Sequence, residues 1–174
     1  MYNSKVRSKL KKIELVVLDV DGTLTDGKVY YSKNGEELKR FSIRDGMGIE
    51  LLRKGDIISA ILTSESSPIV SARANKLKIE NVILGSRNKK QDLINLSEKL
   101  NIDIDKIAFV GDDVNDLQAM QKAGFSACPA DSAEAIKDIA DYVSTKNGGD
   151  GAIREIAELI LVSQNKSITL SESW

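Results

Sequence analysis

Five aspartates end or follow two short apolar runs of the sequence, residues 13–19 and 107–110. They are Asp19, Asp21, Asp112, Asp113 and Asp116. If both runs are parallel strands, the loops beyond their carboxyl ends open into one crevice. Two unit charges about 4 Å apart repel by about 4 kcal/mol at an effective dielectric constant near 20, so a cation must lie among them. Carboxylates without a neighbouring His or Cys suit Mg²⁺, whereas each aspartate by itself could equally form a loop or cap a helix.

Further polar residues follow the other predicted strands. Thr63, Ser64 and Glu65 come directly after residues 57–62, and Lys89 begins a predicted helix after residues 81–84. Lys89 would add a second positive charge to the crevice, although a lysine at a helix start is often only solvated. The chain has no His and only one Cys, Cys128, which excludes Ser-His and Cys-His catalysis and His-based or CxxC metal sites. Acid-base and metal chemistry must therefore come from carboxylates.

The composition narrows the classes of partner. The 174 residues carry 25 Lys and Arg against 26 Asp and Glu, a formal net charge of -1. Without a basic excess we expect no nucleic-acid partner and no attraction to an anionic membrane. No apolar run has the length of a signal peptide or a membrane span, which predicts a cytoplasmic protein.

The elements that must position these residues alternate between strands and helices. Strand-like runs cover residues 13–19, 57–62, 81–84, 107–110 and 125–128, and helical patterns cover about 45–54, 68–77, 89–100, 115–123, 133–140 and 151–163. This alternation predicts an α/β fold, an open parallel sheet between helices. With two prolines, no repeat and no linker, we expect a single domain over residues 1–174.

Two segments depart from the alternation. Residues 28–43 contain two strand-like pieces around Asn34 and Gly35, the strongest short-range signal for a β-hairpin. Because aromatic residues gather there, we expect this flap to serve in oligomerisation, with a plain surface arm as the alternative. The tail, about residues 164–174, is polar except for Ile168, Leu170 and Trp174, and a frayed end is expected.

Together the motifs Asp-x-Asp-Gly-Thr, Thr-Ser, Lys and Gly-Asp-Asp-x-x-Asp resemble the haloacid dehalogenase-like phosphatase superfamily. The resemblance implies a Rossmann-like core, an aspartyl-phosphate intermediate and Mg²⁺. It makes Asp19 the nucleophile and Asp21 the general acid and base, with Thr63, Lys89 and the amides around Asp21 and Gly22 on the phosphoryl group. The metal ligands would be the Asp19 and Asp112 carboxylates and the Asp21 main-chain carbonyl. Asp113 and Asp116 would bind the metal through water molecules or would hold the direct ligands in position. A receiver-type signalling domain places its acidic residues in a different order.

The spacing between the motifs leaves no room for the cap domain that many relatives carry, so another subunit must close the site. The flanking sequence resembles the capless subfamily that dephosphorylates 3-deoxy-manno-octulosonate 8-phosphate and nonulosonate 9-phosphates. This resemblance implies a phosphorylated sugar-acid substrate and a homotetramer in which hairpins meet and a neighbour's tail can cover the site. The alternative is a catalytically silent oligomerisation module of the kind fused to sialate cytidylyltransferases.

The second motif bears on the substrate. Octulosonate phosphatases usually have Thr-Gly-Arg where this chain has Thr63, Ser64 and Glu65, and Glu65 with Lys76 looks more like the nonulosonate branch. The segment Ile-Arg-Asp-Gly at residues 43–46 looks like the octulosonate branch, so the sequence leans only slightly to nine-carbon substrates. Ser64, Glu65, Arg73 and Lys76 are thus the predicted substrate-binding residues beside Gly22. Arg44, Asp45 and Arg154 are further candidates for the sugar-acid carboxylate or the subunit interface.

Overall fold

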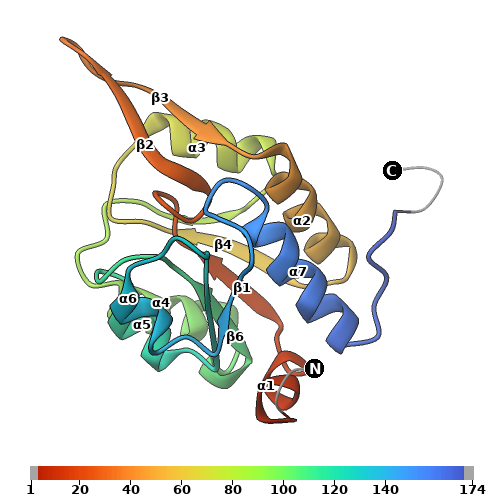
Figure 1. Ribbon diagram of the computed structural model, residues 1–174. Helices are drawn as coiled ribbons and strands as arrows, with labels where there is room; N and C mark the ends of the chain where they lie inside the picture. Colours follow the sequence, from red (N-terminus) through yellow and green to blue (C-terminus); the bar gives the residue numbers. More distant parts are fainter. Residues whose placement is uncertain (1–3, 171–174) are drawn as a thin grey trace.

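A six-stranded parallel sheet forms the centre of the protein (Figure 1). The computed structural model describes residues 4–170, and the strand order is β5-β4-β1-β6-β7-β8. The strands are β1 (Leu15–Leu18), β4 (Ile58–Leu62), β5 (Asn81–Ile83), β6 (Ile107–Val110), β7 (Phe125–Cys128) and β8 (Tyr142–Val143). The order reverses beside β1, which pairs with β4 on one side and β6 on the other. Ligands of such sheets bind at this reversal, beyond the carboxyl ends of the strands.

Helices cover both faces of the sheet, as the alternation predicted. One face packs against α1 (Ser4–Leu10), α2 (Ile43–Lys54), α3 (Pro68–Lys76) and α7 (Ala152–Ser163), and the other against α4 (Lys89–Leu100), α5 (Leu117–Lys122) and α6 (Glu134–Lys137). A 3₁₀ turn, Ile104–Lys106, precedes β6. Along β1, Val16 and Leu18 point into one core and Leu15 and Val17 into the other. Burial on both faces explains why the strands read as continuous apolar runs. The α/β fold is confirmed.

The predicted hairpin is present, but it begins three residues earlier than expected and ends two residues earlier, at Phe41. It consists of β2 (Thr25–Ser32) and β3 (Gly35–Phe41), which form a separate antiparallel sheet and extend away from the helices (Figure 1). Because β2 begins at Thr25, the hairpin continues directly from the Asp-x-Asp-Gly-Thr loop. Three large side chains are exposed on it, Tyr30 at 57%, Tyr31 at 72% and Leu38 at 62%. Its role in oligomerisation stays a prediction.

A buried aspartate joins α2 to α7, which lie side by side (Figure 1). The Asp45 carboxylate accepts hydrogen bonds from the main-chain N–H groups of Gly151 at 3.2 Å and Arg154 at 3.0 Å, at the start of α7. Asp45 therefore caps a helix that is distant from it in sequence. Its carboxylate has a structural role and is 1% exposed, which differs from the sugar-acid or interface role considered above.

The described part of the chain adds few elements beyond the predicted ones. The sequence analysis missed α1 and the two-residue β8, and within residues 4–170 no cap domain interrupts the motifs. The tail differs from the frayed end expected, because Lys166 Nζ donates to the Gly55 carbonyl at 2.6 Å and Leu170 packs against the core. Trp174 lies outside the described residues. None of the helices in residues 4–170 has the length and apolarity needed to cross a membrane, and a cytoplasmic location stays a prediction.

Candidate active site

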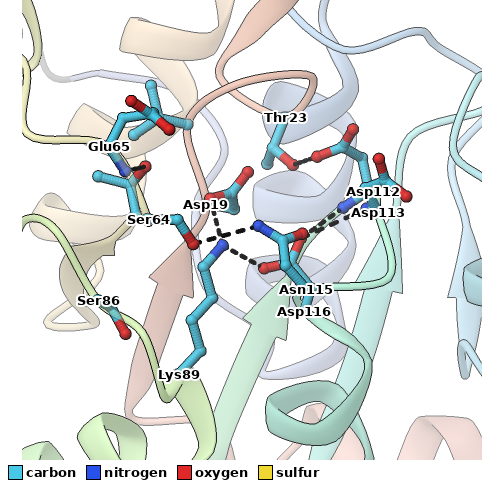
Figure 2. Close-up of polar contacts among 12 residues, drawn as sticks. Asp19, Thr23, Ser64, Glu65, Ser86, Lys89, Asp112, Asp113, Asn115 and Asp116 are labelled. Carbon is cyan, nitrogen blue, oxygen red and sulfur yellow. Dashed lines mark hydrogen bonds and ion pairs between the residues drawn. The ribbon is translucent and has the colours of Figure 1, made fainter.

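A buried lysine lies between two buried aspartates at the carboxyl end of β1 (Figure 2). Lys89 Nζ is 2.6 Å from Asp19 Oδ1 and 2.5 Å from Asp116 Oδ1. Asp19 directly follows β1 and donates its N–H to the Val110 carbonyl, so the sheet itself fixes its position. Lys89 is the first residue of α4. The preceding Asn88 caps this helix, because its side-chain oxygen accepts a hydrogen bond from the Gln91 N–H. The structure therefore favours Lys89 over the exposed Lys90 as the lysine of the site.

The loop after β6 completes an acidic cluster of Asp19, Asp112 and Asp116, whose carboxylates each offer one oxygen within 4.8 Å of the others. Asp116 is fully buried, and its second oxygen accepts hydrogen bonds from the main-chain N–H groups of Asp112 at 3.1 Å and Asp113 at 3.4 Å. The Thr23 hydroxyl donates to Asp112 Oδ1 at 3.1 Å (Figure 2). Asp116 thus belongs to the acidic cluster itself, where the sequence analysis gave it only an indirect part.

The charges of the acidic cluster are unbalanced. Burial and the neighbouring Asp116 and Asp112 raise the pKa of Asp19 well above its ordinary value, although Lys89 opposes them. Burial and Asp116 raise the pKa of Asp112 to about 6. Burial alone would lower the pKa of Lys89, but the two carboxylates outweigh it and the pKa is raised. Three carboxylates around one ammonium leave excess negative charge, and an oxygen-only set of this kind fits a hard divalent cation such as Mg²⁺.

Close contacts between loops require glycine in the first motif. Gly22 has φ of +90°, and a Cβ placed there would lie 2.0 Å from Asp112 Oδ2. Behind it, a Cβ on Gly148 would lie 1.8 Å from the Gly22 carbonyl oxygen. The absence of side chains at Gly148 and Gly149 therefore lets their loop pack closely against the loop that contains Gly22. The Gly22 N–H, predicted to bind a phosphoryl oxygen, donates to Thr25 Oγ1 at 3.3 Å, a long hydrogen bond.

The second motif lies beside the lysine. Thr63 is buried and its hydroxyl accepts the Glu65 N–H at 3.3 Å, while Ser64 Oγ accepts from Asn115 Nδ2 at 3.3 Å (Figure 2). An open pocket of about 440 Å³ adjoins these residues. Its lining includes Ser64, Ser86, Arg87, Lys89, Lys90 and Asn115. Because Lys89 is among the lining residues, the pocket is one route by which a phosphate ester could reach the buried lysine.

The structure adds a lysine that the sequence analysis missed. Lys39 Nζ, on β3, is 2.5 Å from Asp21 Oδ1 and 3.1 Å from Glu36 Oε2. Burial would lower the pKa of Lys39, but the hydrogen bonds and charges of Asp21 and Glu36 outweigh it and the pKa is raised. Lys39 therefore carries its charge at neutral pH. Because side chains alternate along a strand, the sequence could have shown that Lys39 and Arg40 lie on different faces of β3. The pairing between β2 and β3 is irregular, so the sequence does not show which of the two faces points toward the site.

Several predicted site residues have other contacts. Asp113 is exposed and its Oδ1 accepts from the Val114 N–H at 2.7 Å. Arg73 donates to the Ser42 carbonyl at 2.8 Å and lies 5.4 Å from the centre of the Phe41 ring.

The remaining specificity candidates lie at the surface. Glu65, Lys76 and Arg44 are exposed, and within residues 4–170 no ion pair joins Glu65 to Lys76. Arg154 Nε donates to Glu158 at 2.5 Å on the same helix. The roles predicted for Asp113, Arg73, Glu65 and Lys76 stay predictions.

Comparison with known proteins gives consistent matches. A family model described as haloacid dehalogenase-like hydrolase matches residues 53–156. The chain is 42% identical over 164 residues to 3-deoxy-D-manno-octulosonate 8-phosphate phosphatase KdsC of Escherichia coli (strain K12), which covers 94% of this chain and 87% of that protein. The KdsC protein of Haemophilus influenzae is 39% identical over 162 residues, with 93% and 90% covered.

Solved structures agree with the sequence matches. The 3-deoxy-D-manno-octulosonate 8-phosphate phosphatase from Moraxella catarrhalis, solved with a magnesium ion, a phosphate ion and a KDO molecule, superimposes with a TM-score of 0.91 at 41% identity, covering 94% of both chains. The cobalt-bound deoxy-D-mannose-octulosonate 8-phosphate phosphatase from Haemophilus influenzae gives a TM-score of 0.89 at 40% identity, covering 91% of this chain and 93% of that one. The similarity thus spans the whole fold, including the segments that carry the acidic cluster.

Proposed function

The chain belongs to the haloacid dehalogenase-like hydrolases, and from this premise we propose that it hydrolyses 3-deoxy-D-manno-octulosonate 8-phosphate to the free sugar acid and phosphate. The protein is a phosphatase and its cofactor is Mg²⁺. The observation that carries the proposal is Lys89 held between Asp19 and Asp116 at the reversal of strand order, in a chain that matches octulosonate phosphatases over nearly its whole length.

Two aspartates of the first motif perform the chemistry in this proposal. A carboxylate oxygen of Asp19 attacks phosphorus, the bond to the ester oxygen breaks, and Asp21 gives its proton to the leaving alkoxide. Water then attacks the aspartyl phosphate, Asp21 takes the proton from this water, and inorganic phosphate leaves as the Asp19 carboxylate is restored. Lys89 stabilises negative charge on the phosphoryl oxygens, and we keep the buried Thr63 as a predicted contact of the same group.

The acidic cluster would hold the metal. Asp19, Asp112 and Asp116 offer carboxylates close enough to share one ion or its bound waters, and we also keep the Asp21 carbonyl and Asp113 as predicted ligands. When bound, Mg²⁺ neutralises phosphate charge and offsets the repulsion among the carboxylates. The raised pKa values of Asp19 and Asp112 support this assignment, since a cation bound among these carboxylates would favour their ionised form.

The eight-carbon substrate is proposed because the similar proteins are octulosonate phosphatases. The slight sequence lean toward nonulosonate 9-phosphates finds no support among them, and its basis is the exposed Glu65. Gly22, Ser64, Arg73 and Lys76 remain proposed substrate contacts. A glutamate accepts hydrogen bonds from sugar hydroxyls, whereas an arginine at that position would seek an anion. Glu65 is therefore the residue at which the two substrate assignments differ.

Phosphate release tests the proposal. The wild-type protein is assayed with Mg²⁺ on octulosonate 8-phosphate, deaminoneuraminate 9-phosphate and N-acetylneuraminate 9-phosphate, with the Asp19→Asn variant as a blank. We expect the highest kcat/KM on the eight-carbon ester. A higher value on either nine-carbon ester, reduced by Glu65→Gln, would overturn the substrate assignment. No release from any ester would overturn the function and favour the silent module, although both Asp19 and Asp21 are present.

We also propose that the protein is a homotetramer. Tyr30 and Leu38 pair across the two strands and both are exposed, and the adjacent Tyr31 is exposed too, so the hairpin carries apolar side chains that a neighbouring subunit could cover. A site without a cap domain needs closure from another subunit, and a neighbour's tail could supply it. Sedimentation equilibrium of the full chain should give four times the monomer mass, and a monomer at micromolar concentration would refute the assembly.

A further inference from the structure

We propose that Lys39 is a positioning residue that orients the Asp21 carboxylate for proton transfer, an inference that rests on the function proposed above. Lys39 Nζ lies 2.5 Å from Asp21 Oδ1. In residues 4–170, the other oxygen, Asp21 Oδ2, is buried from solvent and has no hydrogen-bond partner. Because Lys39 occupies one oxygen, the carboxylate is left with Oδ2 for the ester oxygen in the first step and for water in the second.

The burial of Lys39 separates this contact from an ordinary surface ion pair. Its side chain is 1% exposed, and that of Asp21 is 26% exposed. The adjacent Arg40 provides a contrast, since its side chain is 59% exposed while it pairs with Asp26 at 3.1 Å. Exposed pairs of that kind fix little, because solvent screens them and the side chains stay free to move. The Lys39 ammonium has lost that freedom, so it can hold a carboxylate in one orientation.

A second set of contacts holds Lys39 itself. Glu36 Oε2 lies 3.1 Å from Lys39 Nζ, and the other oxygen of Glu36 accepts a hydrogen bond from the hydroxyl of Ser67. Ser67 is buried and precedes α3, yet its hydroxyl does not cap that helix. Instead it anchors Glu36. The chain of contacts from Asp21 through Lys39 and Glu36 to Ser67 thus connects the first loop, the hairpin and the segment that follows the second motif.

A positioning role predicts a loss that depends on the leaving group. An alkoxide must be protonated as it leaves, whereas p-nitrophenolate is stable without a proton near neutral pH. The ratio kcat/KM reports the steps up to formation of the aspartyl phosphate, in which Asp21 acts as an acid. We therefore expect Lys39→Met to lower kcat/KM about 10- to 100-fold for the sugar-acid phosphate, part of the ~10²- to 10⁴-fold that general acid catalysis supplies. For p-nitrophenyl phosphate we expect less than about a threefold loss.

The experiment compares four variants with the wild-type protein on both esters, with Mg²⁺ present. They are Lys39→Met, Lys39→Arg, Asp21→Asn and the double variant Lys39→Met/Asp21→Asn. Lys28→Met, at an exposed lysine of the same hairpin, is the matched control and should behave as the wild type. Lys39→Arg should recover most of the alkyl-ester activity because it restores a cation. In the Asp21→Asn background, Lys39→Met should cause no further loss, since its effect passes through Asp21.

The outcomes separate this inference from the proposed function. A wild-type protein that cleaves neither ester refutes the function, and the inference falls with it. A wild-type protein that cleaves both, with Lys39→Met losing activity equally on both or on neither, refutes the inference alone. Equal losses would mean that Lys39 only holds the hairpin in place. A further loss in the Asp21→Asn background would refute it too, and thermal unfolding of each variant identifies losses caused by misfolding.

Discussion

Replacing Asp112 with Asn should stabilise the protein when Mg²⁺ is removed. Burial and the charge of Asp116 raise the pKa of Asp112 from 3.8 to about 6 in the folded protein. The folded state then binds this proton more tightly than the unfolded state. The free energy of unfolding therefore falls as pH rises from 3.8 to about 6, and the full penalty is present above that range.

The size of the effect follows from the same shift. The difference between 3.8 and about 6 corresponds to about 3 kcal/mol, and we take about 2 kcal/mol because Asp112 is partly exposed. The asparagine can still accept the Thr23 hydroxyl, so the contact seen at Asp112 Oδ1 is kept. For a chain of this length, about 2 kcal/mol raises Tm by roughly 4–8 °C.

Thermal unfolding followed by circular dichroism measures this difference. Wild type and Asp112→Asn are compared in EDTA near pH 7.5 and near pH 5, where the wild-type carboxyl is largely protonated and the difference should shrink. Saturating Mg²⁺ at about 100 times Kd should stabilise the wild type by about 2.7 kcal/mol, and the variant by less than half of that. Asp103→Asn, at an exposed aspartate near the opposite end of β6, is the control and should change neither value.

Two results would refute this reasoning. If Asp112→Asn lowers Tm in EDTA near pH 7.5, the carboxylate is not held at an electrostatic cost in the metal-free protein. If the variant keeps the full stabilisation by Mg²⁺, Asp112 does not take part in the metal site. Either result would separate the acidic cluster from the metal chemistry proposed for it.

Three further predictions follow from the same contacts. Asp19→Asn should abolish phosphate release while circular dichroism shows an unchanged fold, and measurable turnover above a blank without enzyme would contradict a covalent mechanism. Lys89→Met leaves two buried carboxylates without their cation, so in EDTA near pH 7.5 denaturant unfolding should show a loss of about 3–5 kcal/mol, and a loss under 1 kcal/mol would count against the buried ion pairs. Asp45→Ala removes the acceptor of the Gly151 and Arg154 N–H groups and should cost about 1–2 kcal/mol in urea unfolding with kcat unchanged, whereas a fall in kcat of tenfold or more at unchanged stability would give Asp45 a direct role.

The sequence was sufficient to predict the sheet and the position of Asp19 at the end of its first strand. Each run is about the length of one strand and is bounded by charged or turn-forming residues, so the pattern locates β1, β4, β6 and β7 nearly to the residue. The positions of Asp19 and Lys89 could be predicted as well, because Asp19 directly follows a strand and Lys89 begins a helix. Segments with little apolar burial were missed, as in α1, where Leu10 is the only buried residue, and in the two-residue β8.

Side-chain partners across loops could not be predicted. Asp113 and Asp116 are equally acidic in the sequence, and only the turn at residues 113–116 directs Asp116 inward onto Lys89 and leaves Asp113 in solvent. Asp45 was a candidate for the sugar-acid carboxylate or the subunit interface, because its hydrogen-bond partner Gly151 lies 106 residues away and the sequence does not show that contact. These contacts depend on how loops return to one another, which local periodicity does not encode.

The hairpin carries the exposed Tyr30 and Tyr31 and also Lys39, which contacts Asp21, the proposed general acid and base. β2 begins three residues after Gly22, and β3 returns Lys39 to the Asp21 carboxylate. We therefore expect a substitution that displaces the strands to disturb both the proposed assembly and the proposed acid catalysis. A charged residue in place of Tyr31, which is exposed near the turn, leaves Lys39 and its partners in place and should weaken assembly alone. If such a variant also loses activity selectively on the alkyl ester, contacts between subunits set the orientation of Asp21, and Lys39 transmits them.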